Sequence, residues 1–137
     1  MRYLAIDLGE RRTGFALGDS ELDLVQPLEV IEHAHPDDVL DAIDQVIAKN
    51  EPRALVIGLP INMDDSEGPA AKRSREVAAR VSERTGLPVH LFDERLTSFE
   101  ADSRMAQSGR THAEKKRVRD AVAAAALLED YFSSLSG

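Results

Sequence analysis

Asp7 is the first residue whose type and position could do chemistry. It lies in an apolar run, Tyr3 to Leu8, that is rich in β-formers and predicts a buried strand. A lone carboxylate there needs a partner or a cation, because an unpaired charge is costly to remove from water. Asp7 is also close to the carboxyl end of the predicted strand, where open sheets bind their ligands. The alternative is a structural aspartate that caps the following turn.

Two further acidic positions could contribute to the same site. Asp93 and Glu94 directly follow another apolar strand-like run and so lie at a second carboxyl end, although adjacent acids are also common in loops. Asp120 stands immediately before eight apolar residues, 121–128, which predict a helix packed on most sides. A solvated Asp120 paired with Lys116, four residues earlier, would explain that residue without any chemistry.

The charged residues are unevenly distributed along the chain. Residues 1–70 carry 15 acids and 5 bases, whereas residues 71–137 carry 10 acids and 12 bases. The net charge of −8 argues against simple nonspecific binding to nucleic acid. A locally basic half could nevertheless steer phosphates along one path. Ordinary solvated helix faces would give the same distribution.

The composition predicts one domain over residues 1–137, since this length fits a single compact core. The absence of cysteine excludes a disulfide framework, a thiolate zinc site and a cysteine nucleophile. The sequence enters its first strand without a signal peptide, and no apolar stretch is long enough to span a membrane. These features together predict a cytoplasmic protein that has no membrane contact.

The elements that must position the acids follow from apolar periodicity and turn residues. Asp37 or Asp38 is expected to cap the first helix, and Pro27 is expected to break the third strand early. Gly58 could let backbone approach the site, or could simply end a strand before Pro60. The predicted elements are strands at 3–8, 13–17 and 25–31, a helix from 39, a strand at 54–59, a helix at 70–85, a strand at 89–92, and helices at 97–107 and 111–132.

The strand order predicts an α/β fold. A hairpin and a third strand, followed by strands alternating with helices, give the order β-β-β-α-β-α-β-α. The run at 54–59 is apolar without alternation, which is typical of a parallel strand covered on both sides. We therefore expect a five-stranded mixed sheet with helices on both faces, which is the RNase H-like arrangement.

Four blocks of this sequence resemble the YqgF family, in the family's order and over about residues 3–132. Each block is modest alone, but together they are specific. They are Ala5–Gly9 with Arg12–Ala16, Val56–Asp64, Asp93–Ser98 with Glu100–Ala101, and Lys116 and Asp120 with Ala123–Ala124 and Leu127–Leu128. The chain departs from the family pattern at Asp65, where glycine is frequent, and at Arg119, where an aliphatic residue is common.

The resemblance implies an RNase H-like nuclease whose acids bind metal. Asp7, Glu94 and Asp120 would be catalytic and would hold divalent cations, Mg²⁺ or Mn²⁺ and in number two. Oxygen ligands suit such hard cations, and two of them can support phosphodiester hydrolysis. Asp93 is an alternative to Glu94 as the direct ligand. We choose Glu94, and expect Asp93 and Lys116 to orient the ligands.

The same resemblance implies a nucleic-acid partner. Arg95 could hold a phosphate or pair with a carboxylate, and a basic cluster near Gly109 could follow a nucleic-acid backbone or be a solvated helix start. The complete set of predicted nucleic-acid contacts is Arg12, Arg95, Arg110, Lys115, Lys116 and Arg117.

The family is associated with maturation of the 5′ end of 16S ribosomal RNA, so the expected substrate is structured RNA in the small-subunit precursor. The alternative is resolution of four-way Holliday junctions, with branched or single-stranded DNA as ligand. A monomer or weak homodimer is expected, and a stable dimer would favour junction cleavage. A noncatalytic nucleic-acid-binding module is a third possibility. The hairpin also resembles the phosphate-binding hairpin of sugar kinases and actin-like ATPases, but those proteins use two lobes.

Overall fold

The computed structural model describes residues 1–96 and 112–135, with the side chains of the last helix described from Arg119 onward. Its centre is a five-stranded sheet in the order β3-β2-β1-β4-β5. The first three strands are antiparallel neighbours, whereas β1, β4 and β5 run parallel to one another. The strands are β1 Arg2–Asp7, β2 Arg12–Asp19, β3 Leu24–Glu32, β4 Ala54–Leu59 and β5 Val89–Asp93. The predicted mixed sheet is therefore confirmed.

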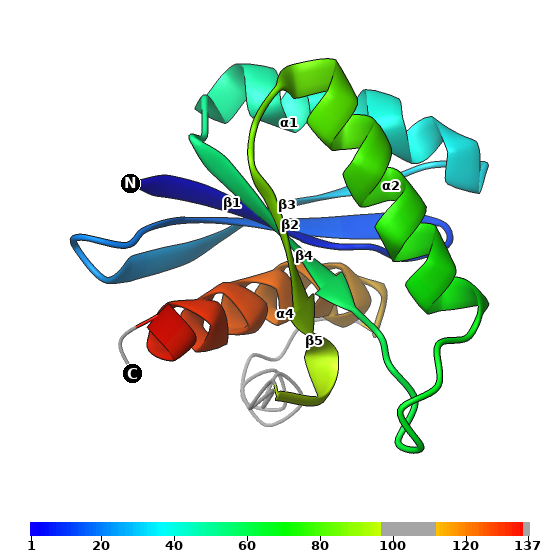
Figure 1. Ribbon diagram of the computed structural model, residues 1–137. Coiled ribbons are helices and arrows are strands. Elements are labelled where there is room, and N and C mark those ends of the chain that lie inside the picture. Colours follow the sequence, from blue (N-terminus) through cyan, green and yellow to red (C-terminus); the bar gives the residue numbers. More distant parts are fainter. Residues whose placement is uncertain (97–111, 136–137) are drawn as a thin grey trace.

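Helices cover both faces of this sheet (Figure 1). Helices α1 (Val39–Asn50) and α2 (Pro69–Thr85) lie on one face, and α4 (His112–Leu135) lies on the other. Side chains of a strand alternate between the faces, so neighbouring residues of β1 enter different cores. Leu4 and Ile6 pack with α1 and α2, while Tyr3 and Ala5 pack with α4.

The core between α4 and the sheet combines small and large side chains of the strands. Ala5, Ala16 and Ala54 lie in it beside larger strand residues, and residues 121–128 of α4 are largely buried there. The apolar run was predicted to be packed on most sides, and α4 does place it against the centre of the sheet. Asp120, just before this run, lies where α4 packs against β2.

One local prediction is wrong and another is confirmed only in part. Pro27 does not end the third strand, because β3 is an edge strand, where proline is tolerated, although its pairing with β2 shifts register between Gly14 and Ala16. Asp38 occupies the N-cap of α1 but makes no side-chain capping hydrogen bond; a short 3-10 turn, Pro36–Asp38, leads into the helix instead. The predicted helix at 97–107 lies outside the described residues.

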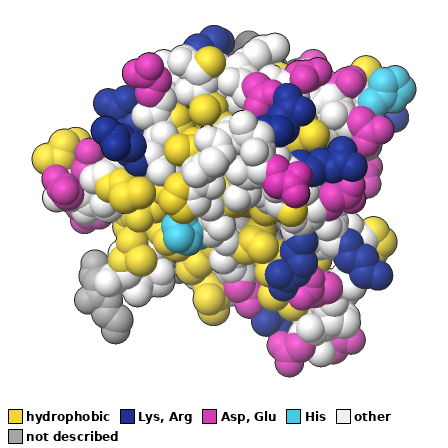
Figure 2. Space-filling view, turned by 45° about the horizontal axis from the view of Figure 1, so that its top comes forward, with side chains coloured by type: hydrophobic (Ala, Val, Ile, Leu, Met, Phe, Trp, Pro, Cys, Tyr) yellow, Lys and Arg dark blue, Asp and Glu magenta, His cyan; other side chains and the backbone are white. Residues whose placement is uncertain are grey.

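Basic side chains lie beside acidic ones on the described surface (Figure 2). Three arginines of α2 illustrate this, since each forms an ion pair: Arg75 with Glu67, Arg80 with Glu76, and Arg84 with Asp44. Much of the positive charge of this helix is thus neutralised locally. Among the described residues, no helix is both long and apolar enough to cross a membrane.

Candidate active site

Asp7 ends the central strand β1 and lies on the face covered by α4. Tyr3 and Ala5 belong to the α4 core, so strict alternation places Asp7 on the same side. Glu94 follows β5 in a short 3-10 turn, Glu94–Leu96, and Asp120 comes from α4. The charges of Glu94 and Asp120 both act on the Asp7 carboxyl group. Three acids from distant parts of the chain therefore meet at one end of the sheet.

Two glycines on the strands flanking Asp7 make this convergence possible. Gly14 of β2 is the direct partner of Asp7, and a Cβ atom there would collide with the backbone oxygen of Asp120. Gly58 of β4 follows Ile57, the partner of Ile6, and a Cβ atom there would collide with Oε1 of Glu94. The structure supports the interpretation that Gly58 permits a close approach at the site. The group that approaches Gly58 is the side chain of Glu94.

The three acids repel one another, and burial adds to the cost of their charges. Burial, followed by the charges of Glu94 and Asp120, raises the pKa of Asp7 to about 7. The pKa of Glu94 is also raised, first by burial and then by the charge of Asp93. Groups poised in this way are typical of functional sites, and a cation is the simplest means of relieving the repulsion.

Asp120 is paired with an arginine of the hairpin. Nε of Arg12 donates to Oδ2 of Asp120 at 2.9 Å, joining the start of β2 to α4. The side chain of Lys116, which the sequence offered as the partner of Asp120, lies outside the described residues. Arg12 was expected to contact nucleic acid, and the structure places it within the acidic site.

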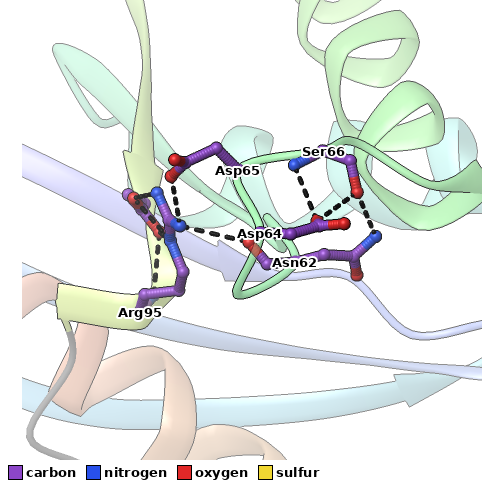
Figure 3. A network of polar contacts seen from close by, with 6 residues as sticks. Asn62, Asp64, Asp65, Ser66 and Arg95 are labelled. Carbon is purple, nitrogen blue, oxygen red and sulfur yellow. Dashed lines mark hydrogen bonds and ion pairs between the residues drawn. The ribbon is translucent and has the colours of Figure 1, made fainter.

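Arg95 joins the ends of β4 and β5 (Figure 3). Its Nε and Nη2 atoms donate to the Asp93 carboxylate at 2.8–3.1 Å. Its Nη1 atom donates to Oδ1 of Asp65 at 2.8 Å and to the backbone oxygen of Asn62 at 3.1 Å. Of the two roles expected for Arg95, the structure shows carboxylate pairing. The guanidinium ties the loop after β4 to the turn that carries Glu94.

Asp65 and Asp93 have different environments within this network. Asp65 has a φ of 70°, in the left-handed region that favours glycine, which agrees with the glycine frequent there in the resembling family. Its side chain is 85% exposed, whereas that of Asp93 is 21% exposed. Hydrogen bonds from Arg95 lower the pKa of Asp93, in contrast to the raised pKa of Glu94.

The donor set of the site fits a hard divalent cation, since all three acids offer oxygen ligands only. Among the described residues, no three His, Cys, Asp or Glu side chains have the mutual spacing of a finished metal site. The raised pKa of Asp7 nevertheless marks an excess of negative charge that a cation would offset. Asp120 directs an oxygen to Arg12 instead.

Comparison with known proteins shows the family to which this chain belongs. The model of the family described as "RuvX: Holliday junction resolvase" matches residues 1–134. The chain belongs to the RuvX family. The expected membership of the YqgF family, which is the same family, is confirmed. A RuvX relative from Anaeromyxobacter sp. (strain Fw109-5), named "Putative pre-16S rRNA nuclease", is 43% identical over 131 residues, covering 96% of each chain.

Solved structures show that the RuvX fold is that of the RNase H-like resolvases. Thermus thermophilus RuvC in complex with a Holliday junction substrate has a TM-score of 0.62 at 13% identity, covering 100% of this chain and 96% of that one. The fowlpox virus resolvase in complex with Holliday junction DNA has a TM-score of 0.64 at 10% identity, covering 100% of both chains. The predicted RNase H-like fold is confirmed, as is the expectation of a hydrolase acting on phosphodiester bonds.

The RuvX structure brings together some of the predicted site residues and not others. Asp7, Glu94 and Asp120 converge, with Arg12 paired to Asp120, whereas Asp93 and Arg95 pair with each other beside the site. The side chains of the remaining basic contacts, Arg110, Lys115, Lys116 and Arg117, lie outside the described residues. Sequence reasoning missed Gly14, although its place in the hairpin opposite Asp7 was a usable signal. Resolvases and nucleases of this fold generally use divalent metals.

Proposed function

We propose that this RuvX protein is a metal-dependent endonuclease that matures the 5′ end of precursor 16S ribosomal RNA in the cytoplasm. The observation that carries the proposal is the convergence of Asp7, Glu94 and Asp120, with the pKa of Asp7 raised to about 7 by burial and by its acidic neighbours. The names of the curated relatives support this choice of RNA.

The roles of the side chains follow from their positions. Asp7, Glu94 and Asp120 would hold one or two Mg²⁺ or Mn²⁺ ions, whose chemistry is to activate water and to stabilise the leaving oxygen of a phosphodiester. Asp7 is the central ligand because it lies between the other two acids. Gly58 leaves room for the Glu94 carboxylate, and Arg95 fixes the turn that carries it. The end of β1, the turn after β5 and helix α4 would thus supply the oxygen ligands.

Resolution of Holliday junctions is the second candidate function, and the family description favours it. The two resolvases with the same fold were solved with junction DNA. Resolution requires two symmetric cuts, so it calls for two copies of the site related by a two-fold axis. A protein that works as a monomer would satisfy the ribosomal function and not this one.

A single cleavage panel tests both functions. Purified protein is incubated with Mg²⁺ or Mn²⁺ and with 5′-extended 16S precursor RNA, single-stranded RNA, single-stranded DNA or a four-way junction. We expect metal-dependent cutting of the precursor RNA at a defined position and little cutting of the junction. Paired symmetric cuts in the junction, made by a dimer, would favour resolution. No cutting of any substrate with either metal would overturn the proposed function.

A further inference from the structure

Arg12 is a cation that the fold places beside Asp120, one of the three acids. It is the first residue of β2, two positions before Gly14, where the backbone of α4 lies close to the sheet. With the described residues it makes one hydrogen bond, from Nε to Oδ2 of Asp120 at 2.9 Å. Asp120 in turn acts on Asp7 by its charge. Arg12 therefore offsets part of the negative charge that would attract a divalent cation.

The Arg12 pair differs from the arginine pair beside it. Arg95 donates hydrogen bonds to both carboxylate oxygens of Asp93 and also to the loop after β4. Arg12 reaches a single oxygen of Asp120, and the two side chains are 37% and 25% exposed. Partly exposed pairs of this kind contribute little to stability, so a divalent cation can replace this one. Several hydrogen bonds hold Arg95 in place, whereas the single hydrogen bond between Arg12 and Asp120 can be displaced by a cation.

We propose that Arg12 is an internal counter-cation that holds Asp120 while the metal is absent and releases it when a divalent cation binds. The released guanidinium then lies at the edge of the site, where its planar donors suit a substrate phosphate. Arg12 thereby couples loading of the metal to binding of the nucleic acid. This inference rests on the proposed function, because it takes Asp120 as a metal ligand.

The first test measures Mn²⁺ binding by calorimetry in the absence of nucleic acid. Arg12→Ala is compared with Arg11→Ala, which removes an equal charge from an exposed neighbour. We expect Arg12→Ala to bind Mn²⁺ about 2- to 5-fold more tightly than Arg11→Ala, the range of a partly exposed pair. Equal or weaker binding by Arg12→Ala would overturn the inference while leaving the metal site intact. If wild type binds no Mn²⁺, the proposed function fails as well.

Thermal melts provide a second readout that does not depend on activity. In EDTA, Arg12→Ala should melt below Arg11→Ala because Asp120 has lost its counter-charge, and added Mn²⁺ should remove most of that difference. In an Asp120→Asn background, Arg12→Ala should have no further effect on either the melt or metal affinity. Arg12→Gln, which keeps a neutral donor, replaces Arg12→Ala if the latter does not fold. A deficit that persists with Mn²⁺ would make Arg12 a purely structural residue and overturn the inference.

The phosphate half of the inference is tested by fluorescence anisotropy with a labelled single-stranded RNA. Ca²⁺, which also prefers oxygen ligands, is added as the cation. Cation should increase RNA affinity more in wild type and Arg11→Ala than in Arg12→Ala, by about 3-fold or more, as for the loss of one charged hydrogen bond. An equal cation-dependent gain in all three proteins would overturn this half.

Discussion

The Asp7 carboxyl group has unusual electrostatics because it follows four buried residues, 3–6, at the end of β1. Burial and the charges of two more acids disfavour its charged form, which a bound cation would favour. A carboxyl group whose pKa is raised on folding stabilises the native state at low pH and loses that effect as the pH rises through the raised pKa. The metal-free protein should therefore lose stability between about pH 4 and pH 7, the interval between the ordinary pKa of 3.8 and the raised one.

Asp7→Asn should abolish that loss. Well below pH 3.8 the metal-free variant and wild type should be equally stable, since Asp7 is then protonated in both the folded and the unfolded state. At pH 8 the variant should be more stable by at most about 4 kcal/mol, the free-energy equivalent of the shift. Melts in EDTA across this range check the prediction, with Glu10→Gln as an exposed control. A variant that melts far below wild type at pH 8 would make Asp7 a structural turn residue instead.

Glu94 and Asp93 are neighbours with opposite electrostatics, which separates their expected roles. Burial raises the pKa of Glu94, whereas Arg95 lowers that of Asp93. Glu94→Gln should weaken Mn²⁺ binding by about 100-fold or more, and Asp93→Asn by no more than about 10-fold, the lower end for a residue outside the coordination sphere. Calorimetric measurement of Mn²⁺ affinity in the two variants shows whether Glu94 or Asp93 is the direct ligand. A larger loss in Asp93→Asn would make Asp93 the direct ligand.

At the scale of elements, the site depends on how closely β2, β4 and α4 can approach. Gly14 admits the backbone of α4, and Gly58 admits the end of the Glu94 side chain. A methyl group at each position therefore has a different consequence. Backbone cannot yield without moving the whole helix, whereas a side chain can swing away at little cost in stability.

Gly58→Ala and Gly14→Ala form a matched pair of variants. Gly58→Ala should displace the Glu94 carboxylate and lower cleavage by about 100-fold, with a change in unfolding free energy below about 1 kcal/mol. Gly14→Ala should push α4 from the sheet and lower stability by about 1–3 kcal/mol. Urea unfolding and cleavage rates test both. If Gly58→Ala cleaves as wild type does, Glu94 is not held in its working position by this contact.

The sequence predicted the order of elements, because that order depends on local patterns, whereas the set of three acids followed from the resemblance to the YqgF family. Apolar runs located β1, β4 and β5 to within a residue or two, and the carboxyl ends of those strands located Asp7 and Glu94. Contacts that depend on tertiary geometry were not predictable. Arg12 and Asp120 are 108 residues apart in sequence, and no local pattern indicates that β2 and α4 bring them together.

At the scale of the whole molecule, an acidic protein must still bind a polyanion. Arg110→Ala, Lys115→Ala and Arg117→Ala together should weaken RNA binding and lower the slope of log affinity against log salt by about 2 to 3, one unit or less per phosphate contact. Mn²⁺ affinity should not change. The control is alanine at Arg75, Arg80 and Arg84, which removes three arginines that are already paired with acids. Equal slopes for the two triple variants would make the basic segment a solvated surface.

The central claim is that Asp7 belongs to a metal-dependent nuclease site, and one cleavage measurement tests it most directly. Wild type and Asp7→Asn are compared on 5′-extended 16S precursor RNA with Mg²⁺, with Mn²⁺ and with EDTA, after melts have shown that both are folded. The account predicts defined cutting by wild type with metal, none with EDTA, and a loss of at least about 1,000-fold in Asp7→Asn, as expected when an essential charge in the transition state is removed. Cutting by Asp7→Asn at the wild-type rate, or undiminished cutting in EDTA, would contradict it.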